Sequence, residues 1–169
     1  MVSTSSFSML IIGEESIDPG IHVRFIAANN AMVFGALSNQ DSEIKSNAIH
    51  LEALIKWQRN LKIPQQNIGE FIPYLDVYAL IKNQNNGNQK VVNLTPHLNL
   101  VEGYHYARNI ELPGDQSDKY QIVFTIETFE EQVTYHQDWK NQYPVPIITK
   151  MQYTYENISF EPIDYVEQE

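Results

Sequence analysis

Residues 71–82 alternate between apolar side chains and a mixed set, and this pattern constrains the fold more than any other feature of the chain. Successive residues of a strand point to opposite sides, so the apolar set lies on one face of an extended segment. The segment leads through an Asn-Gly pair at residues 86–87 into a second apolar run at 90–94. Because Asn-Gly accepts the positive φ angles of a tight turn, the sequence predicts a β-hairpin here.

The same alternation predicts more strands along the chain. Residues 120–127 place four apolar side chains on one face, after a Pro-Gly pair that suits a turn. Short strands separated by turn signals are typical of an antiparallel β-sandwich, and no linker or repeat divides the chain, so we expect one all-β domain over residues 1–169. The remaining predicted strands are 7–13, 22–28, 31–37, 104–111 and 147–158.

Residues 46–60 fit both a helix and a strand. Ser46 can cap a helix and apolar residues recur at helical spacing, so local propensity slightly favours a helix. The segment also alternates as a strand does. The choice decides the chemistry, because His50 and Glu52 share a face on a strand but point about 200° apart on a helix.

Composition limits which functions the chain can have. It has 169 residues, a formal charge of −10 and no cysteine, so any metal must be held by imidazole, carboxylate or thioether. No basic cluster suits nucleic acid or an anionic membrane, and no apolar run is long enough to span a bilayer. The first residues do not form an intact secretory signal. Sequence motifs of common enzymes are missing, so we favour a binding protein over an enzyme.

Histidines fall in segments that can converge on a cation. On a strand, His50 and Glu52 offer a nitrogen and an oxygen ligand from Cα atoms about 6.5–7 Å apart. His97 and His105 follow the predicted hairpin, and a loop of about seven residues between them would bring both imidazoles together. His136 lies in a polar aromatic segment. Ordinary surface or core histidines give the same pattern, so the spacing alone does not show whether these histidines bind a metal.

Several stretches together resemble a known family of bacterial proteins. These are residues 49–53, with the letters IHLEA, followed by 69–75, 103–106, 109–114 and 120–127. In order and spacing they are similar to the periplasmic iron-transport proteins, the metal-binding partners of high-affinity iron permeases. The resemblance implies an immunoglobulin-like β-sandwich that forms a homodimer, a strand at 46–60, a periplasmic location and an inner-membrane iron permease as partner.

The resemblance also implies a metal site. His50, Glu52 and His105 match three of the family's ligands directly. Where the family has a methionine, this chain has His97 or Leu98, depending on the alignment, and we prefer the histidine because leucine has no lone pair. The family's last histidine belongs to a loop that this chain lacks, and His136 is the less direct match for it. The expected ligand set is His50, Glu52, His97, His105 and His136.

This ligand set predicts a harder site than one with a thioether. Among divalent first-row ions copper binds nitrogen and oxygen sites most tightly, so copper is the expected ion in vitro, iron is the cargo that the family implies, and zinc suits the same ligands. We expect metal affinity to fall as the pH drops through about 6.5, because imidazole must be neutral to bind.

Two alternatives stay open at this point. The same ligands would serve a copper-dependent redox enzyme, such as a ferric reductase or a scavenger of oxygen species. A sandwich that binds carbohydrate or another non-metal ligand would instead use a stacking face of aromatic residues. The candidates for that face are Tyr74, Tyr78, Tyr104 and Trp139.

Overall fold

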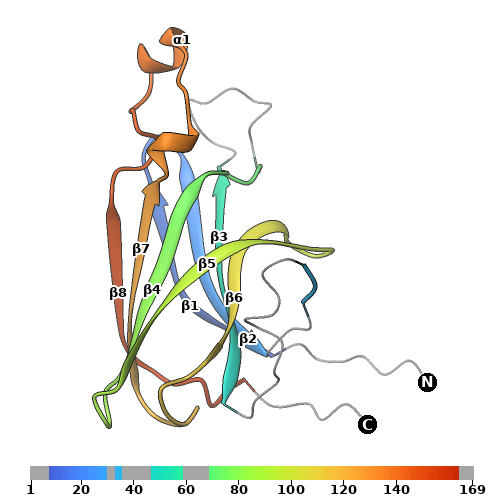
Figure 1. Cartoon of the computed structure of the whole chain (residues 1–169), viewed down its shortest axis with the longest axis vertical. Coiled ribbons are helices and arrows are strands. Elements are labelled where there is room, and N and C mark those ends of the chain that lie inside the picture. The colour runs from blue at the N-terminus through green and yellow to red at the C-terminus, as the bar shows by residue number, and fades with distance from the viewer. Residues whose placement is uncertain (1–7, 30–32, 36–46, 59–68, 164–169) are drawn as a thin grey trace, which may run out of the picture.

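The computed structural model describes residues 8–29, 33–35, 47–58 and 69–163, and its main feature is one antiparallel sheet of eight strands (Figure 1). The strands follow the order β1-β2-β3-β6-β5-β4-β7-β8 across the sheet. Among the described residues, no helix is long and apolar enough to cross a membrane. The strands are β1 (Met9–Ile17), β2 (Ile21–Asn29), β3 (Ala48–Trp57), β4 (Leu75–Asn83), β5 (Gln89–Asn99), β6 (Gly103–Glu111), β7 (Tyr120–Thr128) and β8 (Met151–Ile158).

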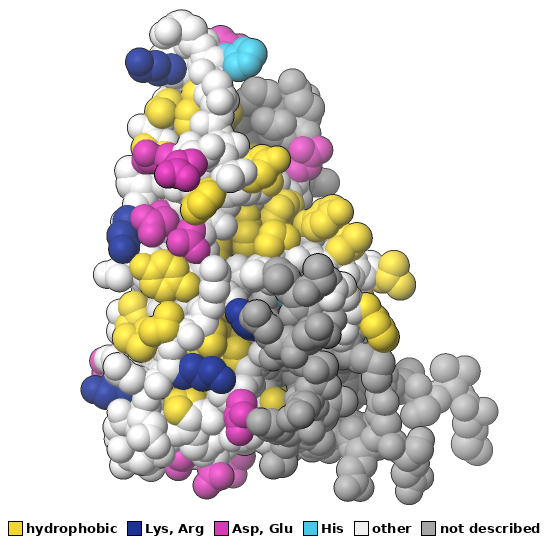
Figure 2. All heavy atoms as spheres, in the orientation of Figure 1, with side chains coloured by type: hydrophobic (Ala, Val, Ile, Leu, Met, Phe, Trp, Pro, Cys, Tyr) yellow, Lys and Arg dark blue, Asp and Glu magenta, His cyan; other side chains and the backbone are white. Residues whose placement is uncertain are grey.

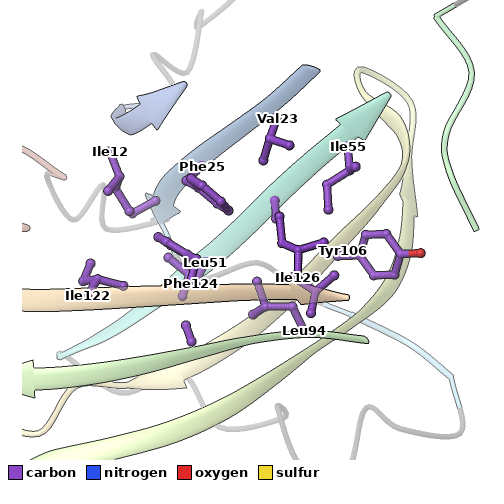
Figure 3. Packing of buried hydrophobic residues seen from close by; sticks show 14 of the residues in the cluster. Ile12, Val23, Phe25, Leu51, Ile55, Leu94, Tyr106, Ile122, Phe124 and Ile126 are labelled. Atoms are coloured by element: carbon purple, nitrogen blue, oxygen red, sulfur yellow. The ribbon is translucent and has the colours of Figure 1, made fainter. Parts of the chain in front are cut away.

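The sheet folds back on itself around one apolar core. Strand β5 joins the two halves, since its first part pairs with β4 and its last part with β6. The outermost strands approach each other through side chains, and the hydroxyl of Tyr155 donates to the carboxylate of Glu15 at 2.6 Å. Inside, Phe25 of β2 stacks on Phe124 of β7 with ring centroids 3.9 Å apart (Figure 3). The all-β prediction is therefore confirmed.

The predicted hairpin is confirmed as β4 and β5, which pair in antiparallel register from Val77 with Leu94 to Lys82 with Gln89. Strand β4 starts at Leu75 rather than at residue 71. Residues 71–74 of the predicted strand therefore precede it, and they include Pro73, which has no amide proton to donate to a ladder. The other predicted strands correspond to β1, β2, β6, β7 and β8 with shifted bounds. The expected strand at 31–37 lies mostly outside the described residues.

Residues 48–57 form strand β3, so the helix favoured by local propensity is wrong. The strand is paired on both sides, with β2 and with β6, and Ala53 lies opposite both Phe25 and Tyr106. Its odd-numbered residues from Ile49 to Ile55 are fully buried. Two ladders and a buried face outweigh a helix preference of a few tenths of a kcal/mol per residue. As a result, His50 and Glu52 share the other face.

Gly13 gives a testable contact at the seam between β1 and β8. A Cβ atom at this position would lie 2.3 Å from the ring of Tyr155. We therefore expect Gly13→Ala to lower the free energy of unfolding by about 1–3 kcal/mol in urea titrations, the usual cost of overpacking. In a Tyr155→Ala background the same change should cost almost nothing. An equal cost in both backgrounds would show that the ring is not the obstacle.

Candidate metal centre

His50, Glu52 and His105 meet on the outer face of the sheet. The pleat of β3 turns Leu51 into the core and its two neighbours outward, and the antiparallel register of β6 brings His105 onto the same face. One ligand atom from each of the three side chains lies within 4.8 Å of the others. All three residues are buried, with exposed fractions of 5%, 6% and 1%. The structure thus brings together the three residues that match the family motif directly.

His97 joins the same group of rings. It lies directly opposite His105 in the β5–β6 ladder, and its ring centroid is 5.5 Å from that of His50 and 6.1 Å from that of His105. The seven-residue loop expected between the two histidines is wrong, because β5 continues to Asn99 and β6 begins at Gly103. The neighbouring Leu98 is 65% exposed. This placement supports the choice of His97 over the leucine.

Hydrogen bonds from Nδ1 orient both buried imidazoles and leave their Nε2 atoms for other contacts. His50 Nδ1 donates to Asn109 Oδ1 at 2.6 Å, and its Nε2 lies 3.5 Å from Glu52 Oε1. His105 Nδ1 donates to the carbonyl oxygen of Gly103 at 2.9 Å. The buried Nε2 of His105 has no hydrogen-bond partner among the described residues. An orphaned lone pair held in this way is typical of a histidine that binds metal.

Burial sets the charge of the group. It lowers the pKa of His50 to about 4, an effect to which His97 adds and which the Asn109 hydrogen bond opposes. Burial, together with the smaller effect of the nearby Glu102 carboxylate, raises the pKa of Glu52 to about 7. Near neutral pH, His50 is therefore uncharged and Glu52 carries only part of its negative charge. A cation at this point would supply the charge that stabilises the Glu52 carboxylate.

A cavity of about 370 Å³ opens onto these side chains, and Glu102 is an acidic lining residue that sequence reasoning missed. The signal for it was a carboxylate three residues before His105, in a segment that already held two histidines. Met9 also lines the cavity and is 52% exposed. The other apolar lining residues are Ile26, Ala28, Val33, Leu98 and Val101.

A family model described as Fe2+ transport protein matches residues 6–161. The chain belongs to the Fe2+ transport protein family. Comparison with curated protein sequences gives no match.

Several solved structures have the same fold as this chain, although their sequence identity to it is low. A copper-bound glutamate-to-glutamine variant of FetP from uropathogenic Escherichia coli is 17% identical, with a TM-score of 0.68 over 90% of this chain and 99% of that chain. The copper-reconstituted P19 protein from Campylobacter jejuni is 22% identical, with a TM-score of 0.68 over 88% and 94% of the two chains. These likenesses support the fold described above.

Within one chain, the fold does not bring His136 close to the four side chains of the proposed metal site. It is exposed and precedes the short helix α1 (Gln137–Lys140), whose Trp139 packs against Trp57 with ring centroids 5.9 Å apart. Trp57 ends β3 seven residues after His50, about 23 Å along an extended strand, and β3 runs toward the end where α1 stands (Figure 1). Its assignment as a ligand stays a prediction.

Three of the four aromatic residues of the carbohydrate-binding alternative pack against different partners. Tyr104 contacts Phe71 at 5.8 Å between ring centroids, and Trp139 contacts Trp57. The ring of Tyr78 lies 6.0 Å from Nζ of Lys150. These contacts do not favour a shared stacking face.

Proposed function

We propose that this protein binds a copper-type metal ion through His50, Glu52, His97 and His105 and takes part in iron acquisition. The observation that carries the proposal is the buried, unsatisfied Nε2 of His105 beside the ligand atoms of the other two buried residues. The copper-bound states of FetP and P19 support it. When bound, the ion supplies the positive charge that a buried carboxylate needs.

The proposed donors are three imidazole nitrogens and one carboxylate oxygen. Imidazole in place of a thioether favours divalent ions over Cu(I), and copper is the tightest of the divalent first-row ions on such donors. The oxygen of Glu52 also suits iron, the cargo that the family description indicates. We therefore infer that copper binds most tightly in vitro and zinc less tightly. Iron is the ion that the protein transports.

We further propose that the protein acts in the periplasm as a homodimer and hands iron to an inner-membrane permease. Three apolar side chains beside the cavity, Leu98, Leu100 and Val101, are 65% to 105% exposed, which suits a surface that meets a partner. Figure 2 shows apolar side chains projecting on the side where the β5–β6 hairpin lies.

The oligomeric state tests the proposed homodimer. Light scattering after size exclusion is expected to give twice the chain mass of 19.6 kDa.

We also propose that the two halves of the sheet form an immunoglobulin-like sandwich. Tyr120 begins β7, and its hydroxyl donates to the carbonyl oxygen of Asp115 at 2.8 Å. A tyrosine at the start of a strand that bonds back to the preceding corner is a hallmark of that fold. The contact supports the finer assignment.

Metal titration tests the central proposal. The purified protein is loaded with Cu(II), desalted and measured by elemental analysis, and we expect one ion per chain. Loading with Zn(II), and with Fe(II) under anaerobic conditions, gives the order of affinities. A copper content far below one ion per chain would contradict a built site, and steady turnover with a reductant and oxygen would favour the redox-enzyme alternative.

Copper affinity is expected to rise about tenfold per pH unit up to about pH 7 and to level off above it, because the ion displaces one proton from Glu52. Burial lowers the pKa of His50 to about 4, so the fall in affinity through about pH 6.5 that was expected for imidazole ligands does not apply to this one. Competition with a chelator from about pH 6 to about pH 8.5 measures the slope. In Glu52→Gln the slope should be absent, and an unchanged slope would assign the proton to another group.

A further inference from the structure

The turn between β5 and β6, at residues 99–103, is fixed by contacts of its own. Asn99 Oδ1 accepts hydrogen bonds from the amides of Val101 at 3.0 Å and Glu102 at 2.7 Å. The side-chain amide of Asn99 also donates to the carboxylate of Glu102. Gly103 closes the turn with φ +71°, a conformation that glycine adopts without strain. These contacts order the turn internally but do not fix where it lies relative to β3.

Strand β6 and the strand that carries two ligands separate before this turn is reached. The β3–β6 register runs from Ala48 with Glu111 to Ala53 with Tyr106 and ends there. Lys56 lies three residues further along β3, on the same outward side of the pleat as Glu52. Its Nζ donates to the carbonyl oxygen of Glu102 at 2.7 Å, and the contact is partly buried. Beyond the β3–β6 ladder the backbone of Lys56 pairs with Phe71 in an isolated bridge, and the Lys56 side chain connects β3 to the β5–β6 turn.

The carbonyl group that Lys56 holds is next to the one that orients a ligand. Glu102 O accepts from Lys56, and the following carbonyl, Gly103 O, accepts from His105 Nδ1 at 2.9 Å. We propose that Lys56 is a positioning residue of the metal site, which holds residues 102 and 103 so that His105 faces His50 and Glu52. This inference rests on the proposed function and extends it to a residue that does not itself touch the ion.

The test compares Lys56→Met with a matched control on the same protein. Lys90→Met is the control, because Lys90 Nζ also donates to a backbone carbonyl, that of Glu111, at 3.3 Å, but this carbonyl is not in the β5–β6 turn. Copper dissociation constants, copper release rates to a chelator and electron paramagnetic resonance spectra are measured for both. We expect Lys56→Met to bind copper about 10–100-fold more weakly, the usual effect of removing a group that orients a ligand, with faster release and altered hyperfine coupling.

The remaining variants make each outcome decisive. Lys56→Arg keeps a charged donor and should recover most of the affinity and the native spectrum, which a loss of general stability would not explain. If Lys56→Met does not fold, Asn99→Ala releases the same turn from its other side and should weaken binding and alter the spectrum. The inference is wrong if the variant that folds matches Lys90→Met in affinity, release and spectrum. If the unaltered protein itself binds no copper, the proposed function fails instead.

Discussion

The double change His50→Ala/His105→Ala is expected to weaken copper binding by about four orders of magnitude. Metal sites with four protein ligands contribute roughly 10–16 kcal/mol, or about 3 kcal/mol per ligand, and each 1.4 kcal/mol is a factor of ten. Both imidazoles are buried and already oriented by Asn109 and by the Gly103 carbonyl, so solvent offers no equivalent replacement. Elemental analysis of loaded, desalted protein and competition titrations measure the loss.

His22→Ala is the matched control for this experiment. His22 lies on β2 with its Nε2 3.4 Å from Glu14, and it does not line the cavity. This variant should retain one copper ion per chain. Equal, low copper content in all three proteins would contradict the central proposal.

His136→Ala tests the ligand that the fold separates from the others. Within one chain this residue lies beside α1, at the end of β3 away from His50. If the isolated chain forms the whole site, the variant should bind copper as tightly as the unaltered protein. A loss of more than about tenfold would show that His136 contributes, and would require a second copy of the chain to supply it.

The part of the site that depends on strand pleat could be predicted from sequence. A His-x-Glu spacing places both side chains on one face once the segment is a strand, and the family resemblance was needed to choose strand over helix at residues 48–57. The local sequence could not decide this, because the two ladders that β3 forms with β2 and β6 involve residues far away in the chain.

The choice between His97 and Leu98 shows why the other residues of the site could be placed only with the structure. A shift of one residue in the register of β5 exchanges its two faces, so one of these side chains points to the site and the other to solvent. The turn of only three residues and the pairing of His97 with His105 fix that register. Glu102 and the contact that Lys56 makes with its carbonyl were missed for a similar reason, since both depend on the path of the β5–β6 turn, which no periodicity describes.

The second large effect concerns stability without metal: Glu52→Gln is expected to raise the free energy of unfolding by about 2–3 kcal/mol near pH 8 and by little near pH 4. The pKa of Glu52 is about 7 in the folded protein, above its ordinary value of 4.5. Stability from the neutral carboxyl is therefore complete below 4.5 and is lost as the pH rises through 7. His50, with its pKa lowered to about 4, has the opposite dependence, but it is present in both proteins and cancels in the comparison.

Urea unfolding of metal-free protein at the two pH values measures this difference, with Glu130→Gln as the control because that residue is exposed and surface changes are usually within about 0.5 kcal/mol. Added copper should reverse the order at pH 8, since an ion bound only by the folded state stabilises it in proportion to its affinity. If Glu52→Gln were less stable than the unaltered protein at pH 8 without metal, the buried carboxylate would already be compensated. A gain that disappears with copper would instead show that this carboxylate destabilises the empty fold and serves the ion.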